Sequence, residues 1–331
     1  MNYSINKFEQ LKIQLNLDKV PKFTEIRLET SNICGYSGFM CPRKKMTRKL
    51  GTMSIEDLNL VLDRFDDIKY ELDFHMHGYG EALLCEDLPE YLKLVTTRKP
   101  NFTPCIITTL GYKKDKQWVE ALFKNGLSKL SISCYGYDKE TYKQVHGVDS
   151  FELVKENLEF IASLQNKYNF HLKVVLDEFG DNYPLPKGYT NKKIQKLKED
   201  FVQYLKKTGI SRISERVLHS FGGGFEKLQS EQNKPPCSVV WGKRRSHIQI
   251  LWDLNVCTCC HDYDGSILWG NLKERSLEQI YKSPQRMEFI KSLCTFEQRP
   301  QLCVKCSALS KPGHYDEEYK AIQEFMGEKN K

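Results

Sequence analysis

Twelve cysteines are the residues of this 331-residue chain whose type and spacing could do chemistry. Five of them lie before residue 135, and the other seven lie between Cys237 and Cys306. A thiolate binds zinc or iron, and thiols in a reducing compartment stay free unless they hold a metal or do redox chemistry. The cysteine content therefore predicts a protein that binds metal or takes part in redox reactions.

The C-terminal cysteines have the stronger metal-binding pattern. Cys303 and Cys306 are separated by two residues, a spacing that lets two thiolates converge on one metal. Further candidates lie upstream, at Cys237, Cys257, Cys259 and Cys260. Four ligands drawn from these six would complete a zinc or a 4Fe-4S site, with free thiols as the alternative.

The N-terminal pair, Cys34 and Cys41, lies in a loop that follows a predicted strand. Loops at the carboxyl ends of strands build the active site of a (β/α) barrel, so two soft ligands there could hold iron or zinc. Two thiols this far apart are a weak signal by themselves. The alternative is a pair of free thiols in a flexible loop.

The elements that must position these residues alternate between two patterns. Runs rich in β-branched and aromatic residues predict six strands, at 24–30, 70–77, 104–109, 127–134, 171–177 and 210–218. Apolar residues three to four apart predict helices between them, at 54–65, 88–97, 116–125, 150–164 and 192–207. Such alternation predicts an α/β fold, either a full or partial barrel or a doubly wound sheet. We favour a partial (β/α)6, TIM-like barrel.

The pattern changes after residue 219. The stretch 220–236 is rich in glycine and proline and predicts a linker. Beyond it we expect a short antiparallel pair at 246–253 and 255–259, a hairpin arm at 262–270, and short helices at 276–281 and 284–293. This small α+β unit would fold with the help of thiol-bound metal. The predicted parts are an N-terminal extension, a barrel, a linker, a small C-terminal domain and a polar tail, at 1–23, 24–219, 220–236, 237–312 and 313–331.

Composition and charge exclude several classes of protein. The chain is 40% hydrophobic and 28% charged, which is ordinary for a soluble globular protein. No stretch reaches the roughly 18 apolar residues of a membrane span, and the first residues lack a signal peptide. We therefore expect a cytoplasmic protein with no membrane partner. A net charge of +7 is too mild for a dedicated nucleic-acid binder, so a zinc-binding nucleic-acid protein is only a third hypothesis.

The loop from Cys34 to Cys41 resembles the cluster loop of the radical S-adenosylmethionine (radical SAM) superfamily. The loop of that family carries three cysteines spaced by three and two residues, and Cys34 and Cys41 match the first and third. The resemblance implies a 4Fe-4S cluster with one open iron that binds S-adenosyl-L-methionine (SAM). It also implies an external electron donor such as flavodoxin or ferredoxin. Cleavage of SAM would give a 5′-deoxyadenosyl radical that takes a hydrogen atom from the substrate.

Gly38 occupies the second cysteine position of this pattern, and glycine cannot ligate iron. We expect Gly38 to impair the SAM-binding cluster. It could be an inactivating substitution, a naturally degenerate site, or a site completed by a substitute ligand. The first explanation is favoured because the surrounding resemblance is otherwise intact.

The resemblance also implies SAM-binding residues. Met40 precedes the last cysteine and would lie near the adenine. Residues 77–81 resemble the Gly-Gly-Glu motif that binds the methionyl amino group; Gly80 and Glu81 match it, and Tyr79 replaces its first glycine. Ser133 matches a serine at the end of the fourth strand. A solvated glutamate in a turn is the alternative for Glu81.

Residues 253–265 and 269–272 resemble the SPASM/twitch extension of radical SAM enzymes, which carries auxiliary iron–sulfur clusters. A single later cysteine pair implies the twitch form with one auxiliary 4Fe-4S cluster. In the family such a cluster accepts an electron from a substrate radical, or it re-reduces a cysteine hydrogen donor in an epimerisation. The implied ligands are Cys237, Cys259, Cys303 and Cys306, with Cys257 and Cys260 as rivals of Cys259.

The substrate and the catalytic residues are less determined by the sequence. His75, His77, Asp177, Glu178 and Arg216 lie at strand ends and could shape a pocket, although each is more often a packed or paired residue. Only about 23 residues precede the first strand, too few for a leader-peptide recognition domain. We therefore expect a small molecule such as a sugar or cyclitol, or a peptide recognised without that domain. The competing hypothesis is a catalytically inactive paralogue, a binding module with a structural metal cluster.

Overall fold

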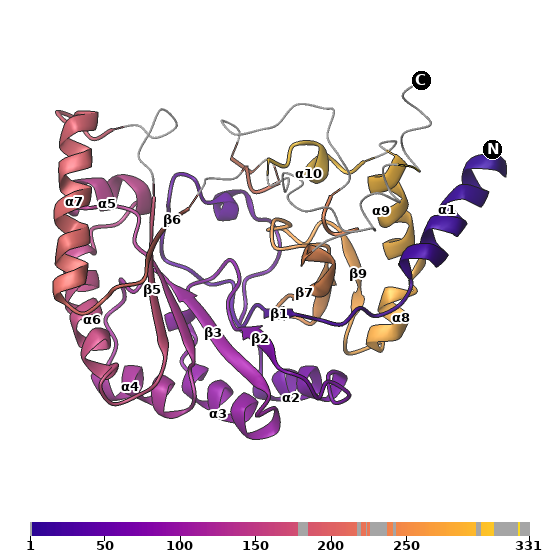
Figure 1. Cartoon of the computed structure of the whole chain (residues 1–331), viewed down its shortest axis with the longest axis horizontal. Coiled ribbons are helices and arrows are strands. Elements are labelled where there is room, and N and C mark those ends of the chain that lie inside the picture. The colour runs from indigo at the N-terminus through magenta and orange to yellow at the C-terminus, as the bar shows by residue number, and fades with distance from the viewer. Residues whose placement is uncertain are drawn as a thin grey trace.

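The computed structural model describes residues 2–177, 185–216, 220–222, 224–225, 237–240, 243–295, 299–307 and 324. A nine-stranded sheet forms its centre (Figure 1). The strands are β1 (Glu25–Leu28), β2 (Leu72–His75), β3 (Phe102–Thr108), β4 (Lys129–Ser133), β5 (His171–Asp177), β6 (Ile213–Arg216), β7 (His247–Ile250), β8 (Asn255–Cys257) and β9 (Leu268–Asn271). Their order is β6-β5-β4-β3-β2-β1-β7-β8-β9, so the sheet is open and β6 and β9 are its edges.

Helices alternate with the strands over the first two thirds of the chain, and further helices lie in the last third. They are α1 (Asn2–Leu15), α2 (Ile55–Arg64), α3 (Leu88–Arg98), α4 (Lys116–Lys124), α5 (Lys139–His146), α6 (Phe151–Leu164), α7 (Asn191–Lys207), α8 (Leu277–Tyr281), α9 (Pro284–Thr295) and α10 (Gln301–Val304). Short 3-10 helices are η1 (Pro42–Lys45), η2 (Ala82–Leu84) and η4 (Lys243–Ser246). Figure 1 shows α2 to α7 outside the parallel strands, and α8, α9 and α10 beside β7 to β9.

The predicted partial TIM-like barrel of the α/β class is confirmed. Strands β1 to β6 are parallel neighbours, and each observed strand lies within or close to its predicted range. Local signals explain the helix boundaries: the Ser54 hydroxyl accepts a hydrogen bond from the amide of Asp57 at 3.0 Å and starts α2. Gly147, with φ of 76°, ends α5 in the left-handed conformation that glycine adopts without strain.

Strand β7 holds a position that the sequence did not predict. The expected antiparallel pair is present as β7 and β8, but β7 also pairs with β1 in parallel, with His247 opposite Glu25. The sheet therefore continues from the barrel strands into the C-terminal residues. Local sequence patterns report strand character but not partners more than 200 residues away, which is why this pairing was missed.

Three helices, α1, α5 and α10, were also missed. In α1, Phe8, Leu11 and Leu15 are buried at helical spacing, a signal that the sequence carries. The Arg245 guanidinium donates to the Leu15 carbonyl, and α1 lies beside α8 and α9 in Figure 1. Helix α5 is short, but Asp138 and Thr141 form a capping box at its start.

Each central strand has an apolar face and a polar face. Ile26 and Leu28 of β1 are fully buried in the core with the helices, whereas Glu25 and Arg27 are half-buried on the other side. Since the register pairs Glu25 with Asp73 and His75 with Cys105, polar side chains of neighbouring strands share one face. We call this set the polar face: Glu25, Arg27, Asp73, His75, Cys105, Lys129, Ser133, Asp177, Arg216 and His247.

Several predicted features lie outside the described residues. They are Glu178, most of the 220–236 linker, the last two residues of the sixth predicted strand and nearly all of the tail at 313–331. The proposed division into domains stays a prediction. Within the described part of the chain, no helix is long and apolar enough to cross a membrane.

Candidate functional site

The loop that carries Cys34 and Cys41 leaves β1 and packs against the end of α5. The amide of Ser37 donates to the carbonyl of His146, and the amide of Phe39 donates to the carbonyl of Val145, both at 3.2 Å. The Cys34 sulfur accepts a hydrogen bond from the amide of Tyr36 at 3.4 Å. The loop is thus fixed to the barrel on both sides of Gly38.

Gly38 leaves this loop with two thiols where the family pattern has three. A Cβ atom built on Gly38 would lie 3.8 Å from the Cβ of Cys41, so a side chain at position 38 would start beside that of Cys41. The same Cβ would lie 3.0 Å from the carbonyl oxygen of Val145, which would have to shift by a few tenths of an ångström. The donor set therefore does not fit a cluster held by three thiolates from this loop.

Burial raises the pKa of both loop thiols above their ordinary values. Desolvation disfavours the charged thiolate, and the nearby Arg43 acts in the opposite direction. A thiolate is the form that binds a metal, so a bound cation would offset the cost of ionising Cys34 and Cys41 here.

Met40 and Arg216 were predicted separately and lie together in the structure. Met40 is buried, packs with Val145 and Phe225, and its sulfur contacts the Arg216 guanidinium. Arg216 also donates to the Asp177 carboxylate at 3.0 Å and lies over the Tyr135 ring at 4.0 Å. An aromatic ring, a thioether and a charged planar group thus surround one point at the ends of β5 and β6.

Ser133 lies at the end of β4 and accepts a hydrogen bond from the Tyr135 hydroxyl at 3.0 Å. The Tyr135 ring stacks on His146, with centroids 5.3 Å apart, and its amide donates to the Nε2 atom of His146 at 3.2 Å. Burial lowers the pKa of His146 to about 3, so this ring is neutral at neutral pH. Sequence reasoning missed Tyr135 and His146, which lie against the cysteine loop.

Gly80 and Glu81 lie where the chain after β2 crosses the cysteine loop. A Cβ atom on Gly80 would lie 2.2 Å from the Ser31 carbonyl oxygen, so only glycine fits without moving backbone. The Glu81 carboxylate accepts hydrogen bonds from the amide and hydroxyl of Thr109 at 2.9 and 2.8 Å, and from the Thr108 hydroxyl. Glu81 is therefore a buried, oriented carboxylate and not a solvated one, which removes the alternative reading of this residue.

The four cysteines predicted as auxiliary ligands line one cavity in the C-terminal residues, which we call the cysteine cavity. Apolar side chains such as Val239, Phe289, Leu293 and Leu302 line the rest of it. This donor set, four thiols around a mostly apolar space, fits a 4Fe-4S cluster. The rivals of Cys259 do not line the cavity: Cys257 is buried at the end of β8, and Cys260 faces a second hollow. The four lining thiols are Cys237, Cys259, Cys303 and Cys306.

The second hollow shares Cys259 with the cysteine cavity and is also lined by residues of the polar face. Arg27 and His247 of the polar face line it together with Cys259 and Cys260. Burial opposes the charge of the Arg27 guanidinium, but Cys260 and the Glu25 carboxylate outweigh that effect and raise its pKa. Cys259 lines both hollows, so the predicted auxiliary ligands and the polar face are direct neighbours.

Hydrogen bonds join the cysteine loop to the C-terminal residues. The Arg48 guanidinium makes two hydrogen bonds of 2.6 Å to the fully buried Glu29 carboxylate, and its Nε donates to the Tyr263 carbonyl. The Asp264 carboxylate accepts from the amide and hydroxyl of Thr47 and from the amide of Arg48. Local sequence patterns carry no signal for the contacts of Thr47 and Arg48 with residues 263 and 264, because these partners lie more than 200 residues apart.

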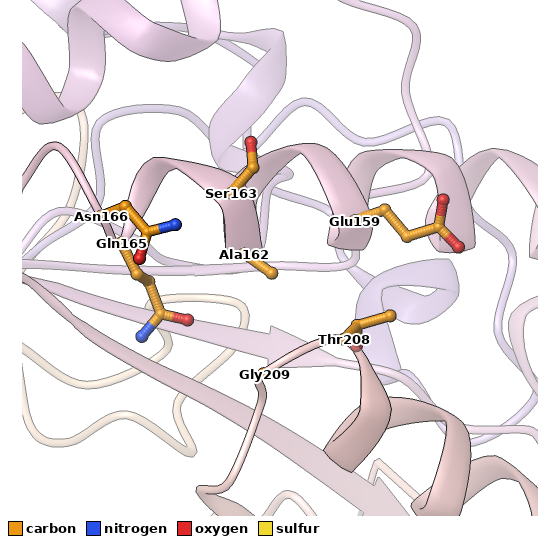
Figure 2. Close-up of a pocket in the computed structure, with 7 residues that line it drawn as sticks. All are labelled: Glu159, Ala162, Ser163, Gln165, Asn166, Thr208 and Gly209. Carbon is orange, nitrogen blue, oxygen red and sulfur yellow. The ribbon is translucent and has the colours of Figure 1, made fainter.

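Another surface hollow does not belong to this site. Figure 2 shows its lining side chains, which come from α6 and from the turn after α7. These helices cover the outer side of the barrel in Figure 1, and none of the predicted site residues lies there. The lining residues are Glu159, Ala162, Ser163, Gln165, Asn166, Thr208 and Gly209.

The chain is similar to curated proteins over part of their length or over nearly all of it. The S-adenosyl-L-methionine-dependent 2-deoxy-scyllo-inosamine dehydrogenase of Niallia circulans is 24% identical over 298 residues, 89% of this chain and 96% of that protein. A probable GTP 3′,8-cyclase of Thermococcus kodakarensis is 28% identical over 190 residues, 56% of this chain. The match covers 54% of the cyclase, about half of its length.

Solved structures with the same fold include BtrN in complex with AdoMet and 2-DOIA. It has a TM-score of 0.58 and 17% identity, and the match covers 88% of this chain and 96% of BtrN. The structure of anSMEcpe with bound AdoMet has a TM-score of 0.54 and 18% identity, with 92% of this chain and 93% of that chain covered. At these identities the likeness shows the fold alone.

Two family models match this chain. The model described as an iron-sulfur cluster-binding domain, SPASM, matches residues 237–307. The model described as the radical SAM superfamily matches residues 28–201, more than half of the chain. These domains imply iron–sulfur clusters and SAM as cofactors, and the protein belongs to the radical SAM superfamily.

Proposed function

We propose that this protein is a radical SAM oxidoreductase that removes hydrogen from a small polyhydroxylated molecule, a sugar or a cyclitol. The observation that carries the proposal is the hollow shared by the polar face and by Cys259 of the cysteine cavity. A polyhydroxylated substrate needs many hydrogen-bonding partners, and the polar face offers carboxylates, imidazoles and cations side by side. The name of the Niallia circulans relative, a cyclitol dehydrogenase matched over nearly its full length, supports this substrate class.

We propose Cys237, Cys259, Cys303 and Cys306 as the ligands of the auxiliary 4Fe-4S cluster. When bound there, such a cluster supplies an acceptor for the electron that leaves an oxidised substrate. Arg27 and His247 would hold substrate oxygens beside Cys259, and the apolar side chains of the cysteine cavity would exclude water from its far side. This arrangement favours a net two-electron oxidation over a hydrogen-atom return.

We further propose that Gly38 weakens the SAM-binding site in this form of the chain. Met40, Gly80, Glu81 and Ser133 would bind SAM as their motifs imply, and flavodoxin or ferredoxin would supply the electron. A cluster held by three thiolates has one iron without a protein ligand. A cluster held by only two thiolates has one more such iron, and this lowers the retention of the cluster.

The test compares the chain with its Gly38→Cys variant after anaerobic reconstitution. Iron and sulfide are counted, and 5′-deoxyadenosine is measured with reduced flavodoxin in the presence of aminocyclitols, sugars or peptides. We expect more iron and substrate-dependent 5′-deoxyadenosine in Gly38→Cys, with aminocyclitols or sugars as the active class. Gly38→Ala is the matched control, since it adds the same Cβ without a thiol. Equal iron content in all three forms would refute the role of Gly38, and turnover of peptides alone would refute the substrate class.

The missing thiol at position 38 also supports a second function. A chain without SAM cleavage would be a binding module in which the auxiliary cluster stabilises the C-terminal residues. Absence of 5′-deoxyadenosine in both the parent chain and Gly38→Cys, with the auxiliary iron retained, would favour this binding module over the enzyme.

A further inference from the structure

Three side chains of the polar face bring different metal-binding donors together. The carboxylate of Asp73, the imidazole of His75 and the thiol of Cys105 each have a ligand atom within 4.8 Å of the others. Asp73 and His75 lie two residues apart on β2, and Cys105 is the register partner of His75 on β3. The hydrogen-bonded sheet therefore holds the three donors in place, away from the cysteine cavity and the cysteine loop.

The histidine is oriented as metal-binding histidines are. Its Nε2 atom lies 3.4 Å from the Glu25 carboxylate. Its Nδ1 atom is buried and has no hydrogen-bond partner among the described residues. A histidine ligand usually has one nitrogen on the metal and the other on a carboxylate, so Nδ1 of His75 is the available ligand atom.

Both acidic and basic side chains surround the three donors. Glu25 and Arg27 face them from β1, Lys129 faces them from β4, and His247 lies beyond Glu25 on β7. Lys129 makes hydrogen bonds of 2.6 and 2.8 Å to the two oxygens of Asp73. Its side chain is 43% exposed, so it can release one oxygen to a metal and keep the other in place.

We propose that Asp73, His75 and Cys105 bind one divalent transition-metal ion, for which Zn²⁺ is the best match. One oxygen, one nitrogen and one sulfur ligand form a set that Zn²⁺ accepts, and three protein ligands leave a fourth position open. That position opens on the polar face, where water or an oxygen of a small molecule can occupy it. The three ligands belong to the polar face but not to the cysteine loop or the cysteine cavity, so zinc binding can be measured without SAM cleavage.

The test measures zinc in the full chain after both cysteine sites have been reconstituted with iron and sulfide. One equivalent of Zn²⁺ is added, unbound metal is removed, and zinc and iron are counted by mass spectrometry. X-ray absorption at the zinc edge then identifies the ligands. We expect about one zinc per chain, with one sulfur and the remaining ligands nitrogen or oxygen.

Variants separate this site from every other group of thiols. Cys105→Ala and His75→Gln should each lower zinc retention by about tenfold or more and leave iron unchanged. Cys134→Ser, at a buried barrel thiol outside the site, is the matched control and should keep zinc. His75→Gln keeps the test valid if Cys105→Ala fails to fold. No zinc in the parent chain, zinc bound by sulfur alone, or ligand variants that retain as much zinc as the parent chain would each overturn the proposal.

Discussion

The cysteine cavity and the cysteine loop differ in how their thiols are assembled. The cavity gathers four thiols from the segment around Cys237, the turn after β8, and α10 with the residues just after it. The loop relies on one short stretch, in which Cys34 and Cys41 flank Gly38. The loop therefore has its whole ligand pattern in one local motif. With Gly38 in the middle position of that motif, one ligand is absent while the fold stays intact.

The comparison also shows what each site contributes to the fold. The cysteine loop is held by backbone hydrogen bonds to α5, and it keeps its path with two thiols. The cysteine cavity lies among short elements whose buried side chains belong to the same core as the barrel, and a bound cluster would add folding free energy there. Loss of a ligand from the cysteine loop should therefore lower activity, whereas loss of a ligand from the cysteine cavity should lower the stability of the fold.

The largest effect is expected from removing one thiol of the cavity. Cys303→Ala should lower the iron retained at the auxiliary site, because three thiolates leave one iron without a protein ligand. Iron and sulfide counts after reconstitution measure this. Cys294→Ala is the matched control, since Cys294 is a buried thiol of α9 that does not line the cavity. Similar iron loss in both variants would contradict the prediction that Cys303, but not Cys294, holds iron of the auxiliary site.

The next effect concerns the Glu29–Arg48 ion pair, which lies beside the contacts that join the two regions. Glu29→Gln should destabilise the chain by about 3 kcal/mol, because it leaves the largely buried Arg48 guanidinium without its charge partner. Denaturant unfolding measures the loss. A double variant, Glu29→Gln with Arg48→Met, should recover part of it, whereas an additive loss would contradict a direct pair.

Two glycines allow the loop to be probed sterically. Gly80→Ala should cost about 3 kcal/mol, because its Cβ would lie 2.2 Å from the Ser31 carbonyl oxygen and backbone must move. Gly38→Ala should cost about 1 kcal/mol or less, since its nearest contact would be at 3.0 Å. Thermal unfolding of both variants tests the order, and a larger loss for Gly38→Ala would contradict the structure of the loop.

The smallest effect concerns Asp264 and pH. Burial alone would raise the pKa of the Asp264 carboxyl, but hydrogen bonds from Thr47 and from the Arg48 amide outweigh it and lower the pKa. A lowered pKa in the folded state gives stability that is present above the unfolded value of about 3.9 and is lost as the pH falls through the folded value. Asp264→Asn should therefore be less stable than the parent at pH 6, and the difference should shrink below pH 4. If the stability difference between the parent and Asp264→Asn were the same at both pH values, the charge of Asp264 would not contribute to stability.

The sequence predicted most of the fold and of the site, and its failures have physical causes. Strand alternation predicted β1 to β6, and cysteine spacing with the family resemblance predicted the thiols of the cavity. Contacts between distant segments, such as Arg48 with Tyr263 and β1 with β7, leave no periodic or local signal. The sequence patterns also missed the group of Asp73, His75 and Cys105, because Cys105 lies beside His75 only through the pairing of β2 with β3.

The pairing of β1 with β7 has a consequence for how the chain is made. Glu25 and His247 are register partners, so the first strand of the barrel stays an unpaired edge on one side until residues beyond 250 have left the ribosome. Closing a loop of this length costs entropy before the pair forms, which slows folding. The barrel therefore cannot finish folding during synthesis before the cysteine-rich residues emerge, and delivery of iron to the C-terminal thiols competes in time with completion of the sheet.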